Sequence, residues 1–229
     1  YGASPHSFAD YAQHLASYGY VVAIPQHPGS DFGQIQAMLA GGSQEVFKLS
    51  EFIDRPLDVT FLLDELERYN RVHFQDKLDL QAVGVMGHSF GGYTALALAG
   101  ATIDFAKLEQ ACGPILGELN LSLLLQCRAL NLPRKVYNFR DQRVKAVLPV
   151  NPVSSKVFGP QGLSQIRIPV FMVAGSADKA APAILEQIGV FPWLTTPERY
   201  LALIKDKPHI GAFAKPDIGL KSIRDKLSL

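Results

Sequence analysis

The most informative stretch of this sequence is Gly87-His88-Ser89-Phe90-Gly91-Gly92, which joins the apolar run 82–86 to the small, mostly apolar residues 93–99. A tight turn between a buried strand and a helix holds its central residue at unfavourable backbone angles, and glycines beside it remove side chains that would collide with both elements. We therefore expect a nucleophile elbow that exposes the Ser89 hydroxyl at the carboxyl end of the strand. The amino end of the following helix then faces the reacting centre, where negative charge develops.

Short apolar runs of the same kind recur along the chain and are bounded by turn residues. They do not alternate apolar and polar residues, which is typical of strands buried on both faces of a parallel sheet. The expected strands are residues 21–25, 82–86, 146–150, 169–174 and 200–204.

Helical periodicity fills the intervals between several of these runs, over residues 7–18, 55–68 and 91–101. Strands that alternate with helices indicate the α/β class, in which connecting helices cover a mostly parallel sheet. The sequence therefore predicts a mostly parallel central sheet that is flanked by helices.

Length and composition fit one globular domain. The chain has 229 residues, of which 48% are hydrophobic and 19% charged, and a chain of this size buries a full core without added cross-links. Between residues 102 and 145 the alternation of strands and helices stops, and two helical patterns at 105–111 and 115–130 precede a polar turn. We expect one domain over residues 1–229, with about 102–145 as a small helical cap insertion.

Hydropathy and charge exclude two classes of partner. No apolar stretch approaches the roughly 18 residues that a membrane-spanning helix needs, so we expect no integral membrane segment. The formal net charge is +1, although residues 1–118 carry −8 and residues 119–229 carry +9, and so we expect no binding of nucleic acid. Basic residues are densest over 128–145, which we interpret as a solvated surface of the insertion; attraction of an anionic substrate or lipid is the alternative.

Cys112 and Cys127 are the two cysteines of the chain. They form no Cys-x-x-Cys pair and no Cys/His spacing typical of zinc, so we expect no structural metal. An even pair inside one insertion is compatible with a disulfide and also with two buried free thiols.

The Ser89 elbow and its surroundings resemble the α/β-hydrolase superfamily, and more narrowly its serine esterases and lipases of the dienelactone-hydrolase-like and platelet-activating-factor acetylhydrolase type. The likeness spans nearly the whole chain. Residues 8–25 resemble the family's first helix and following strand, and residues 55–66 resemble its next helix. Dienelactone hydrolases use a Cys nucleophile, so the serine at position 89 favours the esterases.

The family's chain order of nucleophile, acid and histidine implies the other two catalytic residues. Asp178 follows the expected strand 169–174, and His209 follows 200–204. Asp206 is the second candidate for the acid. His88 adjoins the nucleophile, but a residue at that place in an elbow points away from it, so we expect packing rather than base catalysis. The remaining histidines precede the positions that a base should occupy: His6, His14, His27 and His73.

The resemblance also implies an oxyanion hole and a substrate pocket. The backbone amide of Phe90 would supply one hydrogen bond to the oxyanion, and the amide of Tyr1 would supply the second from the family's His-Gly-x-Gly loop, of which only the later part is present. We expect the rings of Phe90 and Trp193 to contact substrate. Pro152, Val153 and Phe158 are further candidates for apolar pocket walls.

The insertion falls where many lipases carry a lid. Its apolar run 119–125 is compatible with binding an acyl chain and equally with an ordinary packed helix.

These residues predict a serine hydrolase that cleaves carboxylic esters through a Ser-His-Asp triad and an acyl-enzyme, without a metal or other cofactor. Its substrate would be a small-molecule ester or a lipid. A thioesterase or acyltransferase with the same triad is the alternative among enzymes. A non-catalytic binding protein with this fold is the alternative from another class, because fold does not fix function.

The resemblance has one consequence for the start of the chain. The family has already formed its early strands at this point, including the strand that lies between those corresponding to residues 21–25 and 82–86. We therefore expect that residues 1–229 are the later part of a longer chain. The compartment, cytoplasmic or exported, and the oligomeric state stay open.

Overall fold

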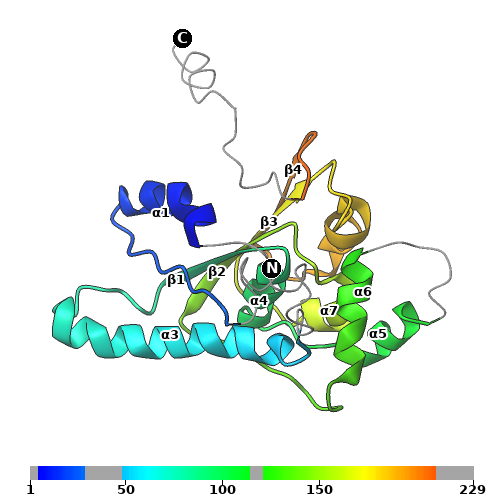
Figure 1. Ribbon diagram of the computed structural model, residues 1–229, viewed down its shortest axis with the longest axis horizontal. Coiled ribbons are helices and arrows are strands. Elements are labelled where there is room, and N and C mark those ends of the chain that lie inside the picture. The colour runs from blue at the N-terminus through cyan, green and yellow to red at the C-terminus, as the bar shows by residue number, and fades with distance from the viewer. Residues whose placement is uncertain (1–4, 29–47, 114–120, 210–229) are drawn as a thin grey trace, which may run out of the picture.

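The structure, a computed structural model, describes residues 5–28, 48–113 and 121–209. Its centre is one sheet of four parallel strands in the order β1-β2-β3-β4, as Figure 1 shows. The strands are β1 (Val83–His88), β2 (Val144–Val150), β3 (Val170–Gly175) and β4 (Arg199–Ile204). Four of the five expected strands are thus confirmed, and so is the parallel sheet.

The pairing register aligns the carboxyl ends of the strands. His88 pairs with Val150 at the end of β1 and β2, and Gly175 pairs with Ile204 at the end of β3 and β4. The segments that follow these residues therefore all leave the sheet at the carboxyl ends of the strands, which we call the carboxyl edge. Parallel α/β sheets carry their functional groups there.

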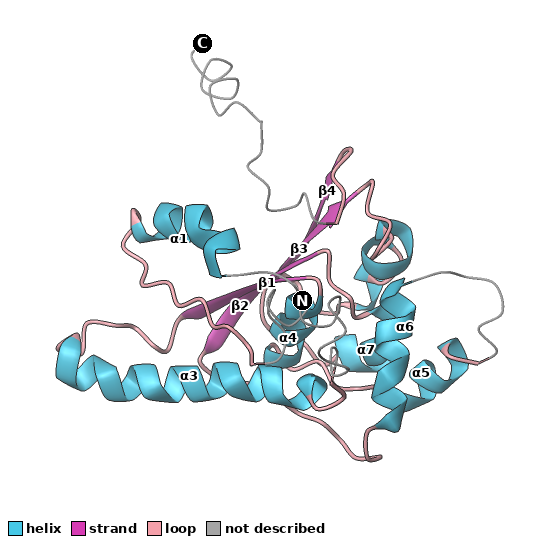
Figure 2. Ribbon diagram, viewed as in Figure 1, coloured by secondary structure: helices cyan, strands magenta, loops and turns pink. Residues whose placement is uncertain are grey.

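Helices surround the sheet (Figure 2). Their bounds are η1 (Pro5–Phe8), α1 (Ala9–Ala16), α3 (Glu51–His73), α4 (Phe90–Leu98), α5 (Phe105–Ala111), α6 (Leu121–Cys127), η2 (Arg128–Asn131), α7 (Ser155–Leu163), η3 (Ile184–Ile188) and η4 (Phe191–Trp193).

Helix α4 is the centre of the core. It packs on β1 and β2, and α3 packs on α4. Because its residues are apolar all round, α4 is buried on nearly every side. The Phe90 ring meets Phe52 of α3 edge-on at 4.9 Å and stacks on Tyr93 at 5.0 Å, while the Tyr93 hydroxyl donates to the Phe52 carbonyl at 2.9 Å.

Residues 21–25 do not form the strand that their apolar run predicts. They are irregular. Val21, the first of them, is 55% exposed, and Tyr20 before it is 62% exposed. A strand persists because a neighbouring strand satisfies its backbone groups. Within the described part of the chain β1 is an edge strand, so residues 21–25 lack that neighbour and their apolar sequence alone does not create one.

The region of the expected insertion is helical, with α5, α6 and η2 in succession. Helix α5 has the bounds that its periodicity predicts, and α6 begins at Leu121, so the earlier part of the expected helix 115–130 lies outside the described residues. Cys112 and Cys127 form a disulfide with a Cα–Cα distance of 5.7 Å, which lies in the usual range. This resolves the alternative that the sequence leaves open.

Part of the basic stretch 128–145 is neutralised by ion pairs. Arg143 lies within 2.6 Å of Asp141, 2.8 Å of Asp64 and 3.2 Å of Glu67. The hydrogen bonds that Arg143 donates to the Asp141 carboxylate raise the pKa of Arg143. Arg143 thereby ties the start of β2 to α3.

Candidate active site

Ser89 occupies a strained turn between β1 and α4. Its backbone angles are φ 57° and ψ −119°. Such strained angles persist only where the surrounding structure holds them in place. A Cβ at Gly87 would lie 2.0 Å from the Gly91 carbonyl oxygen, and one at Gly92 would lie 2.7 Å from the Pro152 Cβ. These two glycines are therefore required by space. Gly91 is not, because a Cβ there would meet no atom within 4 Å.

Three of the predicted residues come together at the carboxyl edge of the sheet. The His209 Nε2 lies 2.9 Å from the Ser89 Oγ, and the His209 Nδ1 lies 2.7 Å from the Asp178 Oδ2. Ser89 follows β1, Asp178 follows β3 and His209 follows β4. The order of the strands thus assembles a continuous hydrogen-bonded chain from residues up to 120 positions apart.

The Asp178 carboxylate is held from both sides. Its side chain is fully buried, and Oδ1 accepts hydrogen bonds from the amides of Ala180 at 2.9 Å and Ala181 at 2.7 Å. These bonds orient Oδ2 toward His209. Asp206, the second candidate for the acid, is exposed, and its backbone amide donates a hydrogen bond to the Ser176 Oγ at 2.8 Å.

The protonation pattern follows from these contacts. An ionised carboxylate only accepts, so the Nδ1 of His209 carries the proton of the bond to Asp178. The Nε2 of the neutral ring then presents a lone pair to the Ser89 hydroxyl. This is the arrangement in which an imidazole takes the hydroxyl proton.

His88 has a contact that its sequence position does not predict. Its Nε2 donates to the main-chain carbonyl of His209 at 2.8 Å, and the two rings lie 4.6 Å apart. Burial, and next the neighbouring His209, lower the pKa of His88 to about 3. The sequence predicts only packing for His88, and the one signal of another role is its position directly before Ser89.

The residues expected to contact substrate or the oxyanion differ in where they lie. The Phe90 ring is 0% exposed because it packs on Phe52 and Tyr93, and its contact with substrate stays a prediction. Trp193 lies in η4, partly buried against the core, and its contact with substrate stays a prediction. Tyr1 lies outside the described residues.

The remaining pocket candidates also support the elbow. Pro152 lies against Gly92, and the Val153 amide donates to the Ser89 carbonyl at 3.2 Å. Phe158 stacks on Tyr93 with ring centroids 4.9 Å apart.

Helix α6 contains most of the apolar run 119–125. Its Leu123 is 9% exposed whereas its Leu124 is 44% exposed, so this helix packs by one face.

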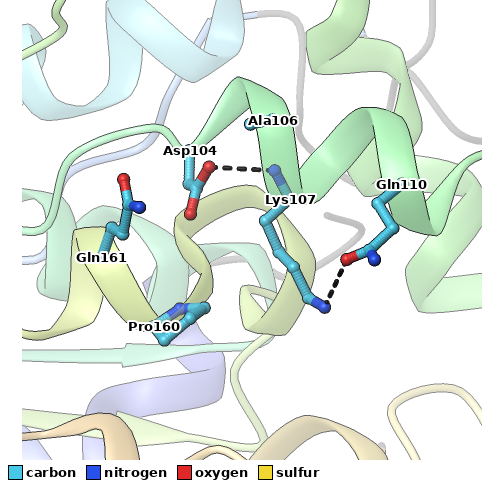
Figure 3. A pocket seen from close by; sticks show the side chains of 6 residues that line it. All are labelled: Asp104, Ala106, Lys107, Gln110, Pro160 and Gln161. Carbon is cyan, nitrogen blue, oxygen red and sulfur yellow. Dashed lines mark hydrogen bonds between the residues drawn. The ribbon is translucent and has the colours of Figure 1, made fainter.

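A surface hollow of about 500 Å³ lies away from the three candidate catalytic residues, between α5 and α7 (Figure 3). Two hydrogen bonds lie in its lining: the Asp104 carboxylate accepts from the Lys107 amide, and the Lys107 ammonium donates to the Gln110 side chain, both at 2.9 Å. Its lining is Asp104, Ala106, Lys107, Gln110, Pro160 and Gln161.

Within residues 5–28, 48–113 and 121–209, no three His, Cys, Asp or Glu side chains converge as metal ligands. Over the same ranges, none of the helices combines the length and the hydropathy that crossing a membrane requires.

Known proteins share this architecture. The chain aligns over 98% of its length with 78% of a dienelactone hydrolase from Anabaena variabilis, at 15% identity and a TM-score of 0.50. It also aligns over 92% of its length with 82% of a metagenome-derived lipolytic enzyme, at 13% identity and a TM-score of 0.52. The chain has the α/β-hydrolase fold. In this α/β-hydrolase chain, residues 48–109, which include α3 and the Ser89 elbow, match the model of the family described as platelet-activating factor acetylhydrolase, isoform II. No curated protein sequence matches the chain significantly.

Proposed function

We propose that this protein hydrolyses carboxylic esters, with Ser89 as nucleophile, His209 as general base and acid, and Asp178 as the residue that orients His209. The observation that carries the proposal is the hydrogen-bonded chain from Ser89 Oγ through His209 to Asp178, at 2.9 and 2.7 Å. It starts from a serine held at strained backbone angles at a helix amino end.

The reaction follows from the roles of these atoms. The Ser89 oxygen attacks the ester carbonyl carbon while its proton passes to the Nε2 of His209, and the carbonyl becomes a tetrahedral oxyanion. The imidazolium then gives that proton to the departing alkoxide, which leaves an acyl-serine. Water, deprotonated by the same Nε2, attacks the acyl-serine and releases the carboxylic acid, and Ser89 recovers its proton.

The oxyanion needs donors in the place where negative charge develops. We propose the backbone amide of Phe90 for this role, because Phe90 is the first residue of α4 and directly follows the nucleophile. The dipole of α4 adds to the stabilisation at this end. The second donor, expected at Tyr1, lies outside the described residues.

The proposed domain organisation assigns residues 1–229 to one domain and about 102–145 to a cap over the site. Two contacts support it, because the Ser122 amide of α6 donates to the Ala180 carbonyl at 3.1 Å, and the Ala180 amide in turn holds Asp178. The helix that the disulfide closes is therefore joined to the loop that carries the acid.

The test is hydrolysis of p-nitrophenyl acetate and butyrate by the wild type, by Ser89→Ala and by Ser164→Ala. Ser164 is a matched control, since its hydroxyl bonds the Gln161 carbonyl one turn back at 2.8 Å. We expect Ser89→Ala to lose at least about 1,000-fold in kcat and Ser164→Ala to retain wild-type activity. Activity that persists in Ser89→Ala would refute the assignment. Faster cleavage of a matched thioester would redirect the proposal to thioesters.

A further inference from the structure

His88 makes one contact for which the proposed hydrolysis has no direct use. It is the last residue of β1, and its Nε2–H donates to the main-chain oxygen of His209 at 2.8 Å. A carbonyl oxygen can only accept, so His88 carries a proton on Nε2. The contact joins residues 121 positions apart, and it reaches the backbone of His209 rather than its reactive ring.

The sheet order makes this contact mechanically important. The nucleophile follows β1 and His209 follows β4, which are the opposite edge strands of the described sheet. The segment after β4 must therefore return along the carboxyl edge, past β3 and β2, before its histidine reaches Ser89. Asp178 fixes the ring of His209, but a single bond to a ring does not fix the Cα from which that ring extends.

We propose that His88 is a positioning residue, which holds the backbone of His209 on the nucleophile strand so that the imidazole meets the Ser89 Oγ. This inference rests on the proposed function. His209 then has three fixed points, which are its carbonyl on His88, its Nδ1 on Asp178 and its Nε2 on Ser89. Because His88 and Ser89 are consecutive, the strand that presents the nucleophile also presents the hydrogen-bond donor.

The surroundings of His88 suit this role. Burial is the largest cause that lowers its pKa to about 3, and the nearby His209 is the next, so His88 stays neutral at neutral pH. The rings of the two histidines are 4.6 Å apart and tilted by 44°. A neutral ring at this distance adds no second positive charge beside the imidazolium that forms on His209 during catalysis.

Two substitutions separate hydrogen bonding from packing. His88→Phe keeps a ring of similar size and removes the donor. His88→Gln removes the ring but keeps an amide N–H at nearly the same distance from the backbone. His73→Phe is the control, because His73 is exposed at the end of α3, where it stacks on Tyr69. Full-length variants are compared for kcat and KM on the p-nitrophenyl esters.

We expect His88→Phe to lower kcat by about 10- to 100-fold, because the general base is displaced, with KM changed by less than about 3-fold. His88→Gln should retain most of the wild-type kcat, and His73→Phe all of it. Wild-type kcat in His88→Phe overturns the proposal. Loss in His88→Gln equal to that in His88→Phe also overturns it, since the ring and not the bond would then matter. If His88→Phe does not fold, His88→Leu takes its place as the variant without a donor.

A measurement independent of turnover separates this inference from the proposed function. We expect the Nδ1 proton of His209, which is bonded to Asp178 at 2.7 Å, to give a downfield proton resonance in the folded protein. We expect that resonance to shift or broaden in His88→Phe and to be retained in His88→Gln. A resonance unchanged in His88→Phe overturns the positioning role even if the wild type hydrolyses no ester. Absence of ester hydrolysis by the wild type, with the resonance lost in His88→Phe, refutes the proposed function alone.

Discussion

Replacement of Asp178 by asparagine tests the assigned roles at the level of single protons. The Oδ1 of Asp178 accepts from the amides of Ala180 and Ala181 at 2.9 and 2.7 Å. An asparagine oxygen can keep both of these bonds, which places its NH₂ group against the Nδ1 of His209, where Oδ2 now lies at 2.7 Å. The NH₂ group only donates, so the Nδ1 must accept and the ring proton moves to Nε2.

With its proton on Nε2, His209 can no longer take the proton of Ser89. The variant therefore retains the fold and the geometry but holds the wrong tautomer, and a loss of about 10⁴-fold in kcat is expected at neutral pH. The assay is hydrolysis of p-nitrophenyl butyrate, with thermal unfolding to confirm that Asp178→Asn is folded. Asp206→Asn is the matched control, because Asp206 is exposed and contributes only its amide to a hydrogen bond with Ser176.

Two results would refute this reasoning. One is a folded Asp178→Asn variant within about tenfold of the wild-type kcat, which is far less than loss of the correct tautomer produces. The other is a loss in Asp206→Asn as large as that in Asp178→Asn, which would make Asp206 the acid.

Four further predictions concern stability. Gly91→Ala should raise the free energy of unfolding by about 1 kcal/mol, because it removes a helical glycine where a Cβ meets no atom within 4 Å. Gly87→Ala should fail to fold, because its Cβ would lie 2.0 Å from the Gly91 oxygen. Urea midpoints of both variants equal to that of the wild type would contradict these two predictions. Loss of the Cys112–Cys127 disulfide in Cys127→Ser should lower the free energy of unfolding by about 3 kcal/mol, as expected for a loop closed over a separation of 15 residues; an unchanged urea midpoint would mean that the thiols are not paired. The folded pKa of His88 is lowered to about 3, so below about pH 6.5 the unfolded chain binds a proton at this residue that the folded chain does not, and the free energy of unfolding should fall by about 2 kcal/mol between pH 7 and pH 5. His88→Gln should lose about 2 kcal/mol less than the wild type over that range. Equal pH dependence of the two free energies of unfolding would argue against a neutral, buried His88.

The sequence predicted the strands of the sheet where local pattern and tertiary pairing agree. The runs that became β1 to β4 are short and apolar, and each has a hydrogen-bonded neighbour in the sheet. Residues 21–25 have an equally strong apolar pattern but no such neighbour among the described residues, so they are irregular. Strand propensity cannot report whether a partner is present, because the partner belongs to another part of the chain.

The helices show the same division between local and distant causes. Helix α5 has the predicted bounds because Asp104 caps it locally, by accepting from the Lys107 amide at 2.9 Å. Helix α3 begins at Glu51, four residues before the predicted start, although Pro56 then lies inside it. Phe52 in that added turn is 1% exposed and packs on Phe90 and Tyr93, and burial of this ring offsets the hydrogen bond that Pro56 cannot donate.

The candidate site was predictable to the extent that chain order specifies it. The expected order of nucleophile, acid and histidine selected Ser89, Asp178 and His209, and the structure brings these three together. The hydrogen bond of His88 was not predictable, because it depends on where the segment after β4 returns to the end of β1. The pairing of the two cysteines likewise depends on how α5 and α6 pack, which a spacing of 15 residues does not specify.

Covalent labelling with a fluorophosphonate, followed by mass spectrometry of the digested protein, measures whether Ser89 is an activated nucleophile. The serine oxygen displaces fluoride from phosphorus and forms a phosphonyl-serine, so the adduct identifies the reacting oxygen without any assumption about the natural ester. The proposed mechanism predicts one adduct, on the peptide that contains Ser89, with a labelling rate that falls steeply in Asp178→Asn and in His209→Gln. A folded protein that carries no adduct on Ser89, or that is labelled equally fast in all three forms, would contradict it.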